Sequence, residues 1–397
     1  MRQKIINNFK FGIINNLEAQ SIPDGSASDS LNWLTEGDHI ELRRGSAILG
    51  TEQTATTKIT GIRTAYKADG TQILYQKRGK KLMYYDTVTS DWIEVGTDIF
   101  TTAGLSDDTS FDNYIGLAGA QLWICSPNSS LFKIMTANPT SYTDMYDSTK
   151  NFKGYIKITQ NRMWLWNRIE DKNGVYGSYI DTQTYTTVSS EATTSLSGTL
   201  AFKAAGAKRT CFGVTITLTV SGEVFTDDYN GVLTGSLGNT GTINYTSGAY
   251  TISIAGTGTA GYQWEDSTNN GIADFTKSAT RTAGQGFIFR QDTGGNVLTL
   301  MTYGDAEFCL HESNAWELTL TATDTSATNL VFREKFGLDY WRGAVATGDG
   351  IYYMDTSDQV KPLFKLLTLS PGSVEKIPVV VTLNYDFSDY RFDFCTM

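Results

Sequence analysis

Short strand-like segments separated by tight turns recur along this chain, and that repetition constrains its fold more than any other feature. In one unit, residues 61–96, alternating polar and apolar residues predict four strands, at 62–67, 72–77, 81–86 and 91–95. Comparable units occupy 109–146, a segment starting at 154, 286–319 and 336–366, and further strands are predicted at VVVTLN and YRFDF near the end. Four antiparallel strands in each repeat of about 40 residues are typical of a propeller blade.

Stacking explains why such units would associate. One four-stranded sheet cannot bury both faces by itself, whereas blades packed face to face can bury them all. In the strand MWLWN, Trp164 and Trp166 share one face, and Met163 and Leu165 share the other. We therefore interpret these aromatic residues, and the pair Tyr340-Trp341, as packing residues more than as platforms for sugars or bases. Two or more separate sandwiches are the alternative architecture.

Residues 197–265 break the blade pattern. They are rich in Thr and Gly and poor in charge, and strands are predicted at 214–220, 242–245 and 249–254. We interpret this segment as a small immunoglobulin-like β-sandwich inserted in a propeller loop, since insertions are tolerated where the ends of a loop lie close together. The expected organisation is an N-terminal segment with the first blades at 1–196, the insert at 197–265, and the remaining blades at 266–397.

The start of the chain holds the best helix candidate. Ser and Asp residues can cap a short helical turn over Ser26–Leu34. A turn follows at 35–38, and the alternation of the next residues predicts a strand over 39–43.

Charge and composition narrow the functional classes. The chain is too apolar and aromatic to be disordered, with 40% hydrophobic and 12% aromatic residues. Its net charge of −10 disfavours general binding to nucleic acid or anionic membranes. The one basic run, KRGKK at 77–81, is interpreted as a solvated hairpin tip, with a phosphate contact as the weaker alternative.

The cysteines and the first residues bear on the cellular compartment. Cys125, Cys211, Cys309 and Cys395 are far apart in sequence and lie beside bulky apolar residues, which predicts buried free thiols. The opening MRQKIINNFKFG has no long apolar segment, and no run of about 20 apolar residues follows, so neither a secretory signal nor a membrane span is expected.

The sequence offers no recognisable catalytic, cofactor or metal site. His39 and His311 are the only histidines, and no GxSxG motif accompanies them, so both are interpreted as structural. The acidic turns at 170–174 and 227–231 carry oxygens that Ca²⁺ could use, but they lack the spacing of an EF-hand loop. We therefore predict no enzyme activity and no catalytic, cofactor-binding or metal-binding residues.

The opening stretch resembles the start of bacteriophage tail and neck proteins with propeller folds. The matching residues are Gly12, Ile13, Asn15, Ile22, Pro23, Asp24, Gly25, Ala27, Asn32, Trp33, Gly37, Ile40, Glu41, Leu42, Arg43, Arg44 and Gly45, with Arg44 standing where that family commonly has Pro. Residues 303–308 and 349–355 are similar to strand turns of such hubs, and 241–254 is similar to the immunoglobulin-like modules of phage tails.

This resemblance implies a tail hub or nozzle protein of the virion, assembled in the host cytoplasm. The expected partners are further copies of the chain in a homo-oligomeric ring, with a hexamer as one stoichiometry, and the neighbouring portal, adaptor and tail proteins. Phage DNA would pass through an acidic lumen without sequence-specific binding, no membrane would be involved, and no cofactor is implied. A receptor- or glycan-binding tail module is the alternative, and a glycan-cleaving propeller is a weaker one.

Overall fold

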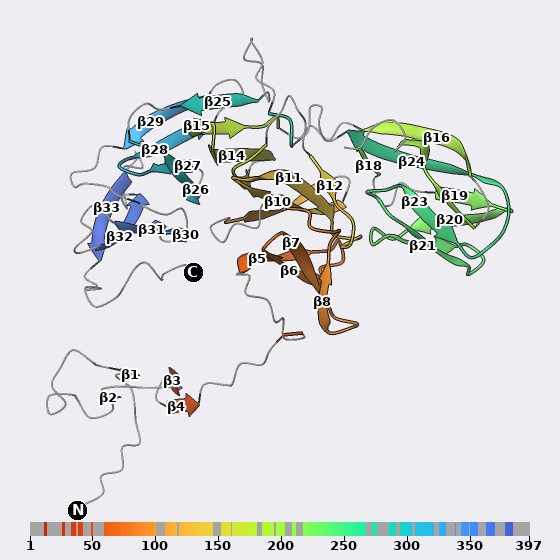
Figure 1. Cartoon of the computed structure of the whole chain (residues 1–397), viewed down its shortest axis with the longest axis horizontal. Coiled ribbons are helices and arrows are strands. Elements are labelled where there is room, and N and C mark those ends of the chain that lie inside the picture. The colour runs from red at the N-terminus through yellow and green to blue at the C-terminus, as the bar shows by residue number, and fades with distance from the viewer. Residues whose placement is uncertain are drawn as a thin grey trace, which may run out of the picture. The chain divides into compact units, whose positions relative to one another are not determined.

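The computed structural model consists of two units, residues 1–53 and residues 54–397, which are described separately (Figure 1). The residues that it describes are 12–13, 26–27, 33–36, 39–42, 49–50, 59–100, 108–116, 119–145, 152–159, 161–180, 185–193, 196–202, 209–211, 217–266, 272–275, 286–290, 294–303, 306–320, 325–330, 338, 343–348, 350–355, 363–369 and 378–383.

The described part of the first unit contains two small strand pairs. β1 (Gly12–Ile13) pairs in parallel with β2 (Ser26–Ala27), and β3 (Trp33–Glu36) forms an antiparallel hairpin with β4 (His39–Leu42). The strand predicted over 39–43 is confirmed for 39–42. The helical turn predicted over Ser26–Leu34 is wrong at both of its ends, which belong to strands β2 and β3, and residues 28–32 lie outside the described residues. The reason is the hairpin register, which pairs Trp33 with Leu42 and so places the end of the expected helix in a ladder.

The described residues of the second unit include five four-stranded antiparallel sheets, which we call blades 1 to 5. Blade 1 is formed by β5 (Ile59–Tyr66), β6 (Gln72–Arg78), β7 (Lys81–Asp86) and β8 (Asp91–Glu94). Blade 2 is formed by β9 (Ser110–Gly116), β10 (Gly119–Ser126), β11 (Ser129–Met135) and β12 (Thr143–Asp144). Blade 3 is formed by β13 (Tyr155–Thr159), β14 (Arg162–Arg168), β15 (Asp171–Gly177) and β25 (Phe287–Arg290).

The remaining two blades follow in sequence. Blade 4 is formed by β26 (Val297–Tyr303), β27 (Ala306–His311), β28 (Ala315–Leu320) and β29 (Thr325–Leu330). Blade 5 is formed by β30 (Ala344–Thr347), β31 (Gly350–Asp355), β32 (Leu363–Leu369) and β33 (Pro378–Leu383). The sequence placed Phe287–Arg290 at the start of the fourth unit, and this was wrong, because that strand pairs with β15 and completes blade 3.

Apolar cores between successive blades hold the stack together. In β10, Leu122 and Ile124 join the core shared with blade 1, and Trp123 and Cys125 join the core shared with blade 3. Alternate residues of one strand thus serve two cores, and all positions of β10 after Gly119 are buried. Blade 3 repeats the arrangement, because Met163 and Leu165 face blade 2 while Trp164 and Trp166 face blade 4. The predicted role of both tryptophans in packing is confirmed.

The inserted module lies between the third and fourth strands of blade 3. Its nine strands are β16 (Thr186–Thr193), β17 (Ser197–Thr199), β18 (Arg209–Cys211), β19 (Thr217–Val220), β20 (Glu223–Asp227), β21 (Val232–Gly235), β22 (Thr240–Ile243), β23 (Ala249–Ile252) and β24 (Gly258–Asp266). They form one sheet whose path runs from β16 to β17. Since these end strands are consecutive in the chain, the sheet rolls almost closed around a single core that includes Leu218, Phe225 and Tyr250. The module includes β16, which precedes the expected boundary at residue 197.

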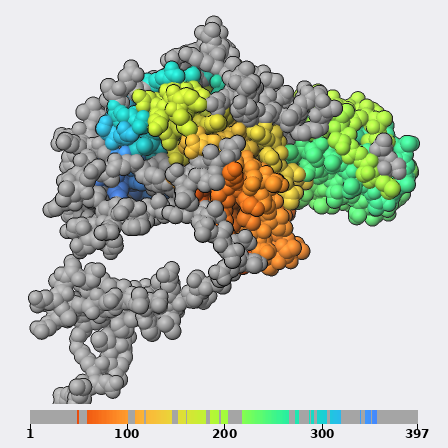
Figure 2. Space-filling view, viewed as in Figure 1, coloured from red at the N-terminus to blue at the C-terminus, as the bar shows by residue number. Residues whose placement is uncertain are grey.

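The module is also attached to blade 2. The Asn138 side chain, in the turn after β11, accepts a hydrogen bond from the Tyr245 amide at 2.9 Å and donates one to the Ile243 carbonyl at 3.2 Å. Met135 at the end of β11 belongs to the core of the module. In the space-filling view, the green surface of the module adjoins the orange-yellow surface of this part of the chain (Figure 2). The insert is therefore fixed by blade 2 as well as by its two covalent links.

The chain is thus all-β, with propeller-type blades and an inserted β-module, which confirms the predicted all-β propeller-type fold class. The insert differs from the expected immunoglobulin-like sandwich, because its described strands form one rolled sheet and not two packed sheets. No α-helix occurs among the described residues. That part of the chain accordingly has no helix long and apolar enough to cross a membrane.

Substitution of Trp164 tests the stacked cores most directly, because this side chain is fully buried between blades 3 and 4. We expect Trp164→Ala to lower the free energy of unfolding by about 3–5 kcal/mol, because it removes a large side chain and leaves a cavity. Val88→Ala in the β7–β8 turn is the control, since Val88 is 90% exposed and its change should stay within about 0.5 kcal/mol. Urea denaturation followed by circular dichroism measures both, and equal unfolding midpoints would contradict the stacked arrangement.

Candidate functional site

The first strands of the blades lie side by side, and their polar side chains form the candidate functional site. Arg63 of β5 contacts Asp112 of β9, and the Asn113 side chain donates to the Thr64 carbonyl at 2.9 Å, both at a spacing of 49 residues. The amides of Ile156 and Ile158 in β13 donate to the side chains of Ser110 and Asp112, both at a spacing of 46 residues. A constant spacing means that the three strands run parallel.

We define the inner seam as five polar residues. Arg63, Asp112, Lys157 and Thr302 lie on the first strands of blades 1 to 4, and Glu307 lies on β27, the second strand of blade 4. Asp112 joins three blades, because its Oδ1 lies 3.3 Å from Arg63 Nη2 and its Oδ2 accepts from the Ile158 amide at 2.6 Å. Lys157 Nζ lies 3.0 Å from Glu307 Oε2 of blade 4. The Thr302 hydroxyl donates to Glu307 Oε1 at 2.8 Å, and Lys157 also contacts Thr302. Side chains therefore connect blades 1 to 4 where no backbone ladder does.

Burial shapes the electrostatics of the seam. The exposed fraction of the side chains falls from 47% for Arg63 to 2% for Glu307. Desolvation raises the pKa of Asp112, although hydrogen bonds from Ile158 and Asn113 and the charge of Arg63 oppose this shift. Desolvation likewise lowers the pKa of Lys157 against the opposing effect of Glu307. Each charge of the seam is compensated by an opposite one, so the arrangement can hold blades in register and presents a neutralised surface.

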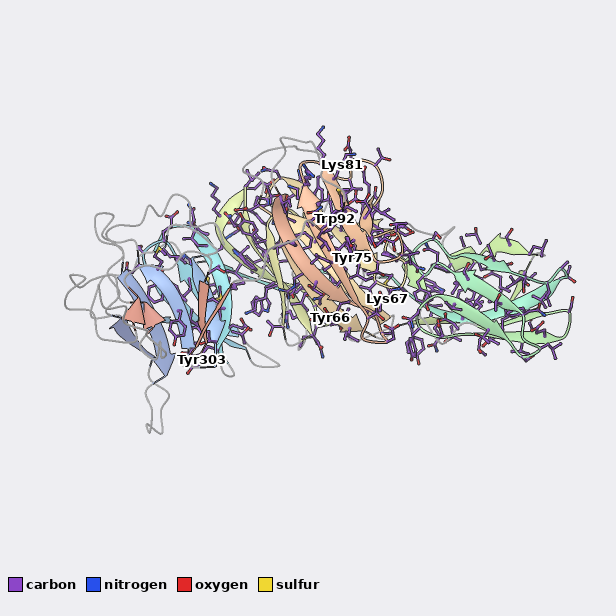
Figure 3. The ribbon with its side chains drawn as sticks, turned by 90° about the horizontal axis from the view of Figure 1, so that it is seen from below. Tyr66, Lys67, Tyr75, Lys81, Trp92 and Tyr303 are labelled. Carbon is purple, nitrogen blue, oxygen red and sulfur yellow. The ribbon has the colours of Figure 1, made fainter. Side chains whose placement is uncertain are left out.

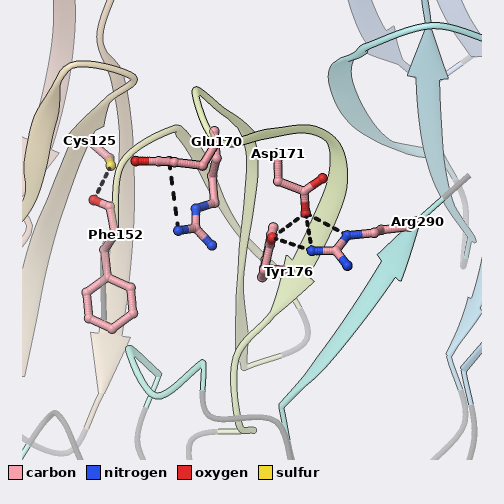
Figure 4. Close-up of polar contacts among 7 residues, drawn as sticks. Cys125, Phe152, Glu170, Asp171, Tyr176 and Arg290 are labelled. Carbon is pink, nitrogen blue, oxygen red and sulfur yellow. Dashed lines mark hydrogen bonds and ion pairs between the residues drawn. The ribbon is translucent and has the colours of Figure 1, made fainter. Parts of the chain in front are cut away.

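A second polar cluster closes blade 3 after the insert (Figure 4). Arg290 Nε of β25 donates to Asp171 Oδ2 at 2.7 Å across 119 residues of sequence, and the Tyr176 hydroxyl also donates to that carboxylate. The Arg168 guanidinium lies 4.6 Å from the centre of the Tyr176 ring. Asp171 lies in one of the two acidic turns whose oxygens Ca²⁺ could use. In the structure its carboxylate instead anchors β25, the strand that returns from the inserted module.

In the second acidic turn, 227–231, the carboxylates likewise accept hydrogen bonds from other groups of the protein. Asp227 Oδ2 accepts from the Tyr245 hydroxyl at 2.6 Å, and Asp228 Oδ1 accepts from the amides of Asn230 and Val232. The described residues contain no group of three or more His, Cys, Asp or Glu side chains that could hold a metal ion. Both turns therefore have a structural explanation.

The basic run at 77–81 divides into a buried and an exposed part. Gly79 and Lys80 form the predicted turn, and Lys81 pairs with Glu94 at 2.7 Å. Lys77, however, is fully buried, with its Nζ 4.9 Å from the centre of the Phe100 ring. The expectation of a solvated tip therefore holds for Lys80 and Lys81 and is wrong for Lys77, whose long alkyl chain packs in the core of blade 1.

Two of the four cysteines are confirmed as buried free thiols, Cys125 and Cys309. Burial raises the pKa of Cys125 to about 12 and raises that of Cys309 as well, so both remain protonated at neutral pH. The side chains of Cys211 and Cys395 lie outside the described residues, as do those of His39, Tyr340 and Trp341.

Cys309 has His311 as its neighbour on β27. His311 Nδ1 lies 3.1 Å from the Gly295 carbonyl, and its Nε2 lies 3.4 Å from Cys309 Sγ. Since a carbonyl only accepts, Nδ1 carries the proton and Nε2 accepts from the thiol. The imidazole is therefore a fully buried, neutral part of the core of blade 4, in agreement with its predicted structural role.

The members of the inner seam were missed at the sequence level. A signal was available at Lys157, which interrupts the apolar run Tyr155–Ile158 of β13, whereas Asp112 stands next to the polar Asn113 in β9. A single sequence does not say which of many charged residues faces another blade, and the pairing became visible only in three dimensions.

The fold defines the class of this protein as an all-β chain with propeller-type blades and an inserted β-module. No family model and no curated protein matches it. The solved structures with low similarity to this chain include the following two. One is the extracellular domain of a candidate one-component system from B. thetaiotaomicron, with 13% identity, 75% of this chain and 32% of that chain covered, and a TM-score of 0.28. This chain thus spans about a third of that one.

The second similar structure is a candidate 6-phosphogluconolactonase from Bacteroides fragilis. Its identity is 8%, the match covers 85% of this chain and 83% of that chain, and the TM-score is 0.25. Both TM-scores are below 0.5, so neither likeness carries an argument about this chain.

Asp112 allows a direct test of the seam. We expect Asp112→Ala to lower the free energy of unfolding by about 1–3 kcal/mol, because the Ile158 amide loses its acceptor. Asp112→Asn retains an acceptor oxygen and should cost less. Arg63→Ala removes only the partly exposed partner and should cost less than about 1 kcal/mol. Urea denaturation measures the three variants, and an Asp112→Ala loss no larger than that of Arg63→Ala would show that the seam does not join the blades.

His311 predicts a specific pH dependence. Burial lowers its pKa below 6.5, so between that value and the folded-state pKa the unfolded chain binds more protons than the folded chain. Stability is therefore complete above pH 6.5 and falls as the pH decreases through the folded-state pKa. We expect the slope of unfolding free energy between pH 6.5 and 5 to flatten in His311→Asn. An unchanged slope in this variant would assign the pH dependence to other groups.

Proposed function

We propose that this chain is a non-catalytic structural component of a bacteriophage tail, a hub or nozzle protein that forms a homo-oligomeric ring around the path of the ejected DNA. The ring would lie below the portal and adaptor of the virion and contact them and other tail proteins. It would be assembled in the host cytoplasm and would need no cofactor.

The observation that carries the proposal is the inner seam. Its ion pairs, Arg63 with Asp112 and Lys157 with Glu307, join neighbouring blades through charges on three first strands and on β27. A wall beside passing DNA should hold no row of free cations, because such a row would retain the phosphate backbone. Compensated charges in a chain with a net charge of −10 satisfy that requirement. The resemblance of residues 12–45 to phage tail and neck proteins supports the same role.

The attachment of the insert also suits a structural role. Contacts of Asn138 and Met135 hold the module on blade 2, so the module extends the blades as a fixed body. An ejection conduit must keep its shape under load, and a module with two kinds of attachment resists displacement better than one on a flexible loop.

One observation favours the second candidate, a receptor- or glycan-binding tail module. The outward positions of β20–β23 carry no charge, and they are exposed: Val224, Thr226, Val232, Thr234, Thr240, Thr242, Ala249 and Thr251. The hydroxyls of Thr242 and Thr251 lie 2.7 Å apart on this face. Neutral hydroxyl-rich surfaces suit neutral polar ligands, and retention of the chain on host cell-surface glycans would favour this alternative.

The ring is tested by the solution mass of the purified full-length chain, measured by light scattering on a sizing column, with negative-stain images of the same peak. We expect a mass several times that of one chain and images with a central channel. A single-chain mass at every concentration, also with adaptor protein added, would overturn the ring function and leave the glycan-binding candidate.

A further inference from the structure

The turn between β20 and β21 contains an Asn-Gly pair, Asn230-Gly231. This turn belongs to the inserted module, which is drawn in green in Figure 3. The Asn230 side chain is half-buried, and its Oδ1 is buried without a hydrogen-bond partner. A buried amide oxygen without a partner is destabilising, so the contacts of this side chain do not explain why an asparagine stands here.

Gly231 lies where the module contacts blade 2. Its carbonyl accepts from the Ile243 amide at 2.9 Å, and the Ile243 carbonyl accepts from Asn138 Nδ2 at 3.2 Å. Gly231 has a φ of +79°, and a Cβ added to it would lie 2.7 Å from the Ile243 carbonyl oxygen and 3.1 Å from Asn138 Nδ2. The close approach of these groups leaves no room for a further carbon atom beside Gly231.

An asparagine followed by glycine can react with its own backbone, because the glycine nitrogen is not shielded by a side chain. The Gly231 nitrogen forms a bond to Asn230 Cγ, and Nδ2 leaves as ammonia together with the proton of the Gly231 amide. Water then opens the five-membered imide at one of its two carbonyls, which gives aspartate or isoaspartate. The Gly231 N–H donates to the Tyr245 hydroxyl at 2.9 Å, so the reaction proceeds while this hydrogen bond is open.

We propose that Asn230 is a site of spontaneous modification, and that its conversion to isoaspartate releases the inserted module from blade 2. In isoaspartate the main chain runs through Cβ and Cγ, so one more carbon atom is inserted directly before Gly231. Either product also replaces the Asn230 amide, whose oxygen is buried, by a carboxylate close in sequence to Asp227 and Asp228. A buried charge beside like charges is destabilising. Both changes act on the contact that Asn138 makes with the module, and neither depends on the proposed ring function.

A second Asn-Gly pair, Asn173-Gly174, provides a comparison within the same chain. Both of its residues lie inside β15, where Gly174 pairs with Arg290 of β25. Side chains of a strand stand roughly perpendicular to the sheet, whereas attack by the next nitrogen requires the asparagine side chain to lie along the backbone. Asn230 lies in a turn, between β20 and β21, and is not held in this way.

The test incubates the folded full-length chain at mildly alkaline pH and follows both pairs by peptide mass mapping, in which each conversion gives a defined mass increase. We expect Asn230 to convert about ten-fold faster than Asn173, because only the turn allows the reacting atoms to approach. In urea both pairs should convert at similar rates, which shows that both are detected.

Hydrogen exchange measures the release of the module. The Tyr245 amide donates to Asn138 Oδ1 at 2.9 Å, and we expect it to lose protection as Asn230 is converted. Asn230→Gln is the matched control, because glutamine keeps the amide group but would have to close a larger ring. Its Tyr245 amide should keep the protection of the fresh variant on ageing. Fresh and aged wild type are also compared directly, so the test does not depend on the stability of the variant.

Equal rates at Asn230 and Asn173 in the folded chain would reduce the reaction to a property of the dipeptide and overturn the assigned site. An Asn230 that stays unmodified in the folded chain while the urea-unfolded chain converts would overturn it as well. Conversion at Asn230 with unchanged protection of the Tyr245 amide would overturn the release of the module.

Discussion

The structure depends on one constraint, which is that a four-stranded sheet with two apolar faces must be covered on both sides. Strand β10 shows it most directly, since Leu122 and Trp123, neighbours in sequence, belong to cores on opposite sides of blade 2. Each blade is stabilised by the next, so the stack behaves like a repeat protein in which interfaces contribute much of the stability. The same constraint explains why Lys77 can be buried, because its alkyl chain and the Phe100 ring fill a layer that the blade needs to be full.

Polar side chains add specificity to this apolar stacking. Apolar faces alone would let neighbouring sheets slide, whereas the Asp112 carboxylate fits only one position relative to Arg63 and Ile158. The pKa of Asp112 is raised by burial, so its ionised form is held at a cost, and the hydrogen bond to a backbone amide offsets part of it. The Arg290–Asp171 contact does the same within blade 3, where it brings a strand back to its sheet after the inserted module.

These features connect the fold to the proposed role. A tail ring must be stiff and must present compensated charges to DNA, and the seam contributes to both because it uses charge to lock blades together. The inserted module is held by Asn138 as well as by its two covalent links to blade 3. A neighbouring protein bound to the module would therefore be held in a fixed position relative to the blades.

The sequence by itself determined the four strands of blade 1, the stretch of chain that forms blade 2, the β-rich insert, the opposite faces of Trp164 and Met163, and the buried state of Cys125 and Cys309. Alternation with period two and the turn residues between strands carry that information locally. Local pattern was not sufficient at Phe287–Arg290, because this strand pairs with β15 on the other side of the inserted module. The side-chain contact of Arg290 with Asp171 spans 119 residues. It was also insufficient at Trp33, whose hairpin partner lies across a turn.

Only the tertiary structure decided which charged side chains meet. Asp112, Lys157 and Glu307 come from three different blades, and nothing in their local sequence specifies the offsets of 46 and 150 residues that join them. Those offsets are set by the lengths of turns and of the insert, and by how the apolar faces align the sheets. Strand identity is a property of neighbouring residues, whereas the seam is a property of the stacked faces, and for this reason the fold class could be predicted and the candidate site could not.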